Sequence, residues 1–206
     1  MKLGLISDIH GDPVALELAW SHLIVEGVDR IICAGDLVGY GPFPDRVVAF
    51  VVEHGISSAR GNHDRWALER GPGVADEFGG ATPSAGTLDH LRTLPFDVVV
   101  GAHPAVGVVV HGSPRSDMEF VNKNSHPPSL LRGYLQALNC DFLVVGHTHQ
   151  PMWFRCREGL VVNPGSVVSM PVIDSSRTFA IVDLDTLEVE FHDVESGEAV
   201  EVEAWE

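Results

Sequence analysis

Five short polar segments stand out in this sequence because each follows an apolar run and each carries side chains that bind metals. Their sequences are SDIHGD at 7–12, GDL at 35–37, RGNHD at 60–64, VHGS at 110–113 and GHTHQ at 146–150. The candidate metal ligands among them are Asp8, His10, Asp36, Asn62, His111, His147 and His149. Carboxylate, amide and imidazole groups suit borderline metals such as Mn, Fe, Zn or Ni, whereas a structural zinc site typically uses thiolates.

The number of candidates indicates two metal ions rather than one. A single catalytic ion must keep open positions and cannot use seven protein ligands. Two ions that share a bridging carboxylate can use all seven ligands. Asp36 is the natural bridge, because it is alone in its loop and stands between the other groups in the sequence. The pairs Asp8/His10 and His147/His149 are spaced i, i+2, so an extended backbone places each pair on one side. We therefore predict a site for two divalent ions and favour manganese.

The first sixty residues predict the elements that position these groups. Strands are predicted at 2–7, 30–34 and 56–60, and helices from Asp12 to Gly27 and from Pro44 to Gly55. This βαβαβ start indicates a largely parallel sheet with right-handed crossovers. In such sheets functional groups lie beyond the carboxyl ends of the strands, which is where the polar segments fall.

The rest of the chain predicts a second sheet. Apolar runs recur at 96–101, 106–111, 141–146, 152–155, 160–162, 178–183 and 187–193, with one helix near 128–138. Many strands with short connections favour an α/β fold in which two sheets pack together as a sandwich flanked by helices. We see no linker or repeat, so residues 1–206 are expected to form one domain. Residues 65–94 contain GPG and GG breaks, which predict a surface insertion or partial lid.

The composition of the chain argues against several classes of binding partner. With 13 basic and 29 acidic residues the formal net charge is −16, which repels polyphosphate backbones, so duplex nucleic acid is not expected as a partner. The three cysteines form no CxxC pair, which argues against a disulfide framework and favours a cytoplasmic location. The apolar regions are too interrupted to span a bilayer, and we expect neither a signal peptide nor a membrane partner.

The combination of motifs resembles a known family. DxH at 8–10, GD at 35–36, GNHD at 61–64, HG at 111–112 and GHTH at 146–149 together look like the calcineurin-like metallophosphoesterases. NPGS at 163–166 resembles a loop of the smaller bacterial members, and GDLVGYGPFP resembles a bacterial phosphoesterase subgroup. The resemblance implies a four-layer αββα sandwich, in which two facing sheets are flanked by helices.

The resemblance also implies how the ligands divide between the ions. One ion would be held by Asp8, His10, Asp36 and His149, and the second by Asp36, Asn62, His111 and His147. The chain departs from the family at one position. Many members have GDxxD, and Gly39 stands here in place of the second Asp, so the role of that carboxylate is absent. This departure bears on the substrate class rather than on metal binding.

The two remaining residues of GNHD are the catalytic candidates. His63 is one residue beyond Asn62 and should face differently, so that it can hydrogen-bond a phosphoryl oxygen or protonate the leaving group. Asp64 is expected to orient the His63 imidazole and to keep it protonated.

The predicted function is hydrolysis of phosphate esters by a hydroxide that bridges the two ions, with phosphodiesters ahead of monoesters. One alternative is a phosphomonoesterase, either a protein phosphatase or a dinucleoside-polyphosphate hydrolase, although these call for more cationic recognition groups. The other is a non-enzymatic scaffold of the same fold. Edge strands near the C-terminus are compatible with a homo-oligomer, although acidic residues there would equally protect an edge.

Overall fold

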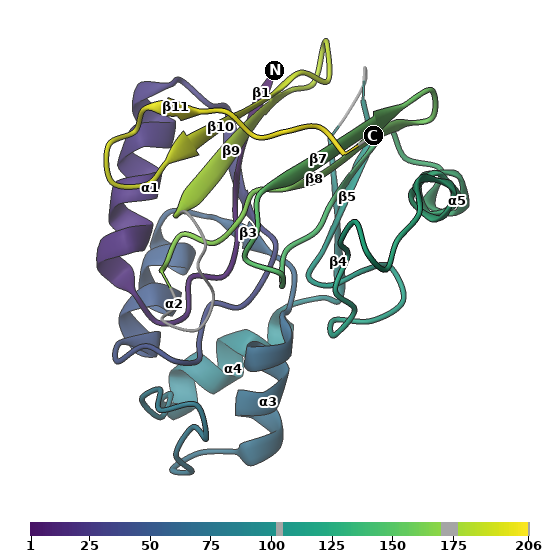
Figure 1. The fold of residues 1–206 in the computed structure, drawn as a ribbon. Coiled ribbons are helices and arrows are strands. Elements are labelled where there is room, and N and C mark those ends of the chain that lie inside the picture. Colours follow the sequence, from purple (N-terminus) through teal and green to yellow (C-terminus); the bar gives the residue numbers. More distant parts are fainter. Residues whose placement is uncertain (102–104, 170–176, 206) are drawn as a thin grey trace.

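Two β-sheets lie face to face in the computed structural model, which describes residues 1–101, 105–169 and 177–205 (Figure 1). Within these residues the first sheet has six strands, in the order β11 (Ala199–Val200), β10 (Val189–Asp193), β9 (Thr178–Asp183), β1 (Lys2–Ile6), β2 (Arg30–Cys33) and β3 (Ser57–Ser58). The second, within the same residues, has five strands, in the order β4 (Asp97–Val100), β5 (Gly107–Val110), β6 (Phe142–Val144), β8 (Gly159–Asn163) and β7 (Met152–Cys156).

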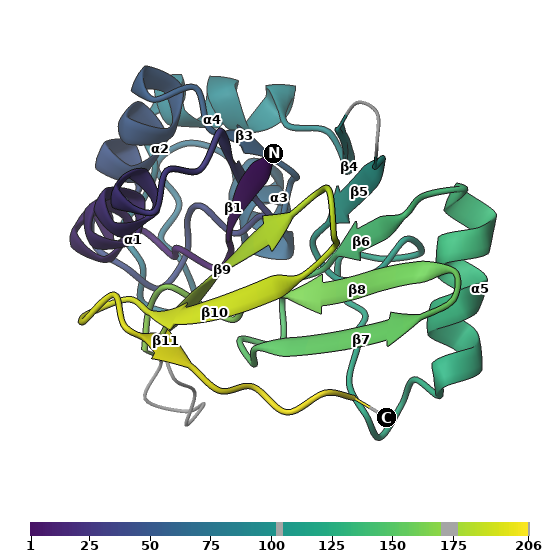
Figure 2. The same cartoon turned by 90° about the horizontal axis from the view of Figure 1, so that it is seen from above.

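Helices cover the outer faces of this pair of sheets. The helices α1 (Pro13–Val25), α2 (Pro44–Glu53) and α4 (Ala85–Thr93) lie over the first sheet, and α3 (Asn62–Arg70) packs beside α4. The helix α5 (Pro128–Leu138) lies over the second sheet on the opposite side of the molecule (Figure 2). The predicted four-layer αββα architecture is therefore confirmed.

Side-chain alternation along the strands builds a separate hydrophobic core between each pair of layers. In β1, Leu3 and Leu5 join the core between the two sheets, whereas Ile6 joins the core under the helices. In β5, Val109 faces the other sheet and Val110 faces α5. A strand covered on both faces needs apolar residues at nearly every position, which explains the near-continuous apolar runs of the sequence.

Parallel pairing brings the carboxyl ends of the central strands to one rim. The strand β1 pairs in parallel with β2, and β2 pairs in parallel with β3. In the second sheet β5, β6 and β8 run parallel to one another. All five polar segments of the sequence follow one of these strands, so the loops that carry them meet at the same edge of the sandwich.

The third predicted strand is shorter than expected. The sequence predicted residues 56–60, but only Ser57 and Ser58 form β3. The amide of Ala59 still donates to the carbonyl of Cys33, at 3.0 Å, whereas the amide of Arg60 donates to the carbonyl of Pro95, at 2.8 Å. The chain therefore leaves the sheet at Arg60.

The segment 65–94 contains more packed structure than a surface insertion would. It includes most of α3 and all of α4, and Leu88 and Leu91 of α4 are buried in the core under the first sheet. The turn between these helices, around residues 72–81, lies largely at the surface. A role of this segment in controlling access to the site stays a prediction.

The core between the sheets gives a stability prediction. Phe142 is fully buried there, and its ring fills the space beside Gly107, where an added Cβ would lie 2.1 Å from the ring. Replacing Phe142 by Ala should lower the free energy of unfolding by about 3–5 kcal/mol, because the neighbouring strands cannot close the cavity. Urea unfolding measures this, with Phe96→Ala as the control since Phe96 is 36% exposed. A similar loss in the two variants would contradict the assignment.

Candidate metal centre

The structure brings the seven predicted ligands together at the rim formed by the strand ends. All are buried, and none is more than 9% exposed: Asp8, His10, Asp36, Asn62, His111, His147 and His149. They come from both sheets. Four of them follow strands of the first sheet, namely Asp8, His10, Asp36 and Asn62. The other three, His111, His147 and His149, follow strands of the second. The site is therefore built across the sandwich rather than on one sheet.

One group of donors is formed by Asp8, His10 and His149. Their ligand atoms all lie within 4.8 Å of one another. The Nε2 atoms of His10 and His149 are 3.0 Å apart, and Asp8 Oδ1 is 3.3 Å from His149 Nε2. Two imidazoles and a carboxylate converge here, and they are three of the four ligands predicted for the first ion.

A second group is formed by Asp36, His111 and His147, again within 4.8 Å of one another. His111 Nε2 lies 3.2 Å from Asp36 Oδ2 and 2.9 Å from the amide oxygen of Asn62. Asp36 Oδ2 is also 3.9 Å from Nε2 of His10, which belongs to the first group. The carboxylate of Asp36 thus stands between the two groups, where a bridging ligand would be needed.

The outward nitrogens of two histidines fix which nitrogen faces the centre. His10 Nδ1 donates to the carbonyl of Val38, at 3.2 Å, and His111 Nδ1 donates to the carbonyl of Ala34, at 2.8 Å. With Nδ1 donating outward, Nε2 of each ring faces the centre. Such hydrogen bonds to a backbone carbonyl are typical of histidines that ligate metals.

Several buried polar atoms of the centre find no hydrogen-bond partner among the described residues. They include Asp8 Oδ1 and His147 Nε2. A buried polar atom without a partner costs free energy, and a cation would offset that cost for a carboxylate oxygen or an imidazole lone pair. The donor set therefore fits divalent metal ions.

Backbone strain is concentrated at the same residues. Eight non-glycine residues have a positive φ in the described part of the chain, and five of them are predicted ligands: Asp8, His10, Asp36, His147 and His149. This conformation is unfavourable for L-residues and persists at functional sites when the surroundings enforce it. Gly61 permits the close packing, because an added Cβ would lie 2.0 Å from Asp36 Oδ1.

Burial and neighbouring charges shift the pKa values of the acidic and imidazole groups in the centre. Burial raises the pKa of Asp8, but the imidazole of His149 outweighs it and brings the pKa to about 2. Burial also opposes ionisation of Asp36, yet His111 holds the pKa of Asp36 well below its usual range. Burial lowers the pKa of His10 to about 4. Ionised carboxylates and a neutral imidazole are the states in which these groups bind metals.

His63 lies at the edge of the centre. Its ring is packed against the rings of His10 and Tyr40, with centroids 5.0 Å and 4.5 Å away, and its ligand atom groups with those of His10 and Asp36. Its Nδ1 has no partner among the described residues, and burial lowers its pKa. His63 is therefore a buried imidazole next to His10 and Asp36, with one ring nitrogen that has no partner among the described residues.

The predicted role of Asp64 is wrong. Its carboxylate accepts hydrogen bonds from four backbone amides, those of Asp36, Leu37, Val38 and Gly61, at 2.9–3.2 Å. Asp64 is the third residue of α3, so its side chain points back over the helix N-terminus and away from the His63 ring. It fixes the loop that carries Asp36 and does not orient His63.

The sequence analysis did not identify some residues that hold the histidine loop. Asn163 Nδ2 donates to the carbonyl of Gly146, at 2.8 Å, and to Thr148 Oγ1, at 3.0 Å. Ser166 Oγ donates to the carbonyl of Asp8, at 2.9 Å. The NPGS motif that contains Asn163 and Ser166 was the available signal, and its polar ends brace loops from both sheets.

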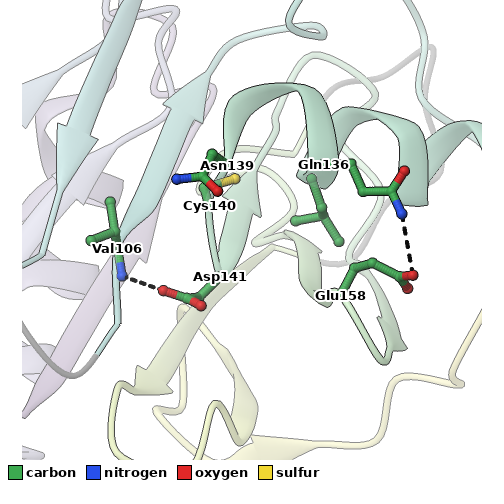
Figure 3. Close-up of a pocket in the computed structure, with 7 residues that line it drawn as sticks. Val106, Gln136, Asn139, Cys140, Asp141 and Glu158 are labelled. Carbon is green, nitrogen blue, oxygen red and sulfur yellow. Dashed lines mark hydrogen bonds between the residues drawn. The ribbon is translucent and has the colours of Figure 1, made fainter.

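Another hollow, of about 380 Å³, lies away from this centre beside the N-terminal ends of β5, β6 and β8 (Figure 3). Three of its polar side chains are already paired: Asp141 accepts from the amide of Val106, at 2.8 Å, and Gln136 donates to Glu158, at 3.3 Å. Burial raises the pKa of the Cys140 thiol to about 11, so this cysteine is a poor nucleophile.

Comparison with known proteins identifies the class. The chain belongs to the calcineurin-like phosphoesterase superfamily, whose domain profile matches residues 1–187. This is a metal-dependent family, and the clustered His and Asp donors are the groups that could hold a metal here. Among the described residues, none of the helices is both long and apolar enough to cross a membrane.

Solved structures agree with this assignment. A metallophosphoesterase from Sphaerobacter thermophilus is 30% identical and has a TM-score of 0.74, over 95% of this chain and 88% of that one. A hypothetical protein from Pyrococcus horikoshii is 24% identical with a TM-score of 0.79, over 94% and 88%. Yfce, a phosphoesterase from E. coli, is 23% identical with a TM-score of 0.63, over 98% and 97%. Because their sequence identities are low, the last two similarities are evidence for the fold alone.

The contacts of Asp64 give a prediction that separates positioning from catalysis. Asp64→Asn replaces one acceptor oxygen by an NH₂ group that faces backbone amides. We expect a loss of about 2–4 kcal/mol in the free energy of unfolding without metal, together with weaker Mn²⁺ binding, because the Asp36 loop is no longer held.

Chemical unfolding of metal-free protein and calorimetric Mn²⁺ titration measure the two effects. Asp97→Asn is the control, since Asp97 is exposed at the start of β4. If Asp64→Asn lost activity while stability and Mn²⁺ affinity were unchanged, the positioning role would be refuted in favour of a catalytic one.

Proposed function

We propose that the protein hydrolyses phosphate esters, with phosphodiesters preferred, at a centre of two divalent metal ions. The observation that supports this most directly is the pair of donor groups that meet at Asp36. Asp8, His10 and His149 would hold one ion and Asn62, His111 and His147 the other, with Asp36 between them. Two bound ions would supply Lewis-acid catalysis and activation of water at neutral pH.

The charge of the ligands favours binding of an anionic substrate. The proposed ligands contribute two carboxylates, Asp8 and Asp36, against the charges of two divalent ions. Asn62 adds an oxygen ligand without a negative charge. The loaded centre would therefore be positive and would attract a phosphate group, although the chain as a whole carries a formal charge of −16.

His63 is the residue placed to act on the phosphate ester itself. One ring nitrogen of His63 lies within 4.8 Å of the ligand atoms of His10 and Asp36, so a phosphate bound there would lie within reach of the ring. We propose that His63 hydrogen-bonds a phosphoryl oxygen or passes a proton to the leaving group. The carboxylate of Asp64 accepts from backbone amides, so it is not the group that would hold a proton on His63.

The arginines that follow the proposed ligands in the sequence are already paired, which favours a diester over a monoester. Arg65 is bonded to Asp117, at 2.6 Å, and to Glu69, at 2.9 Å. Arg115 forms an ion pair with Glu119. A phosphate monoester or a polyphosphate carries additional negative charge and calls for free cationic groups, whereas a singly charged diester does not.

The backbone strain at five proposed ligands also favours a functional centre over a scaffold.

Metal counting gives a test that does not depend on activity. The native protein should bind two Mn²⁺ ions per chain after removal of its metals and reconstitution. Asp36→Asn should lose tight binding of both, because the shared carboxylate is gone, and His149→Ala should retain one. Elemental analysis after gel filtration measures this. A native protein that binds no ion when Mn²⁺ is in excess would support the scaffold alternative instead.

Hydrolysis tests the activity. Metal-free protein should be inactive towards bis(4-nitrophenyl) phosphate, and Mn²⁺ should restore turnover above that of 4-nitrophenyl phosphate. His63→Ala should reduce turnover of the diester by about 10²–10⁴-fold with Mn²⁺ binding retained, because proton transfer is lost. His54→Ala is the control, since His54 is exposed at the end of α2. Equal turnover by the two variants would refute the role of His63, and higher turnover of the monoester would favour a phosphomonoesterase.

A further inference from the structure

A hollow of about 350 Å³ opens directly beside the metal centre. Its lining includes His10 of the centre together with Tyr40, Pro42, Phe78 and Val168. Apart from the imidazole, these are aromatic or apolar side chains. A group esterified to a phosphate at the centre would therefore meet an apolar surface on this side.

Two aromatic rings of the hollow touch the proposed catalytic histidine. The ring centroid of Tyr40 is 4.5 Å from that of His63 and 4.8 Å from that of His10. The ring of Phe78 is 5.1 Å from His63 and 5.4 Å from Tyr40. Because His63 is the proposed proton donor to the leaving group, the departing alcohol lies on the side of these two rings.

Phe78 is held at the surface by the turn that carries it. It is 41% exposed, although it is a large apolar side chain. Its ring stacks on Trp66, with centroids 5.4 Å apart and planes at 21°. Its amide donates to Asp76 Oδ1, at 2.9 Å, and Asp76 pairs with Arg70, at 3.3 Å. The turn thus fixes an exposed ring beside the centre at the cost of leaving it in contact with water.

The charge of the lining indicates which kind of group fits. None of its described residues is a lysine or an arginine. Its acidic residue, Asp12, is the N-cap of α1 and accepts from the amides of Val14 and Ala15, at 3.0 Å and 3.1 Å. Such a lining disfavours a second phosphate or a carboxylate, whereas an uncharged planar ring can stack on exposed aromatic side chains.

We propose that this hollow is the leaving-group subsite, and that it receives an uncharged, planar aromatic alcohol esterified to the phosphate, with Phe78 and Tyr40 against its ring. This inference rests on the proposed phosphoesterase activity and names the substrate class. In the reaction an oxygen from water bonds to phosphorus, the bond from phosphorus to the aromatic oxygen breaks, and that oxygen leaves as an alcohol with a proton from the His63 imidazolium; the proton that water gives up restores the imidazolium. Phe78 is a specificity-determining residue in this scheme.

Non-hydrolysable phosphonates test the subsite by binding alone. Calorimetric titration of Mn²⁺-loaded protein should give benzylphosphonate an affinity on the order of 10-fold higher than that of ethylphosphonate, because only the former has a ring to stack. Phe78→Ala should abolish this preference and leave ethylphosphonate binding unchanged, and Phe78→Leu should reduce it. Phe43→Ala is the matched control, since Phe43 is 48% exposed and lies outside the lining. The kcat/KM for bis(4-nitrophenyl) phosphate should fall in parallel with benzylphosphonate affinity.

The outcomes separate this inference from the proposed function. If diesters are hydrolysed but the two phosphonates bind equally, or if Phe78→Ala weakens both to the same extent, the aromatic subsite is refuted and the phosphoesterase assignment stands. If no phosphate ester is hydrolysed and neither phosphonate binds the Mn²⁺-loaded protein, both proposals fail.

Discussion

The carboxylate of Asp64 is the contact on which the geometry of the centre depends. It accepts hydrogen bonds from Gly61 before α3 and from three successive amides after β2, and so joins the two loops that carry Asn62 and Asp36. Backbone amides in strained loops need such an acceptor, because they have no partner in a regular helix or sheet. With the loops joined, Asp36 is held between the two donor groups despite its left-handed backbone.

Much of the fold and of the donor set could be predicted from the sequence because each depends on local pattern. Apolar runs separated by glycine and proline indicated the strands, and the helix at 128–138 was predicted at its observed position. The candidate donors could be identified because each follows a strand whose carboxyl end reaches the same rim. Strand pairing therefore brings together residues as distant in sequence as Asp8 and His149, which lie within 3.3 Å.

The parts that were not predicted depend on contacts that leave no local pattern. The predicted partner of Asp64 was its neighbour His63, but the first turn of α3 directs the carboxylate back to the amides of another loop. The turn that carries Phe78 contains glycines and a weak apolar pattern, so the sequence predicted only a surface segment. Its position beside Tyr40 follows from tertiary packing, including the stacking of Phe78 on Trp66.

Because the donors come from both sheets, metal binding at the centre depends on the two sheets staying packed together. Asp8 and His10 come from the first sheet and His149 from the second, while Asp36 and Asn62 face His111 across the same boundary. A cation held by such a set is a crosslink between the two halves of the inner core. Its binding free energy then adds to the cooperativity of unfolding, since the sheets cannot separate without releasing it.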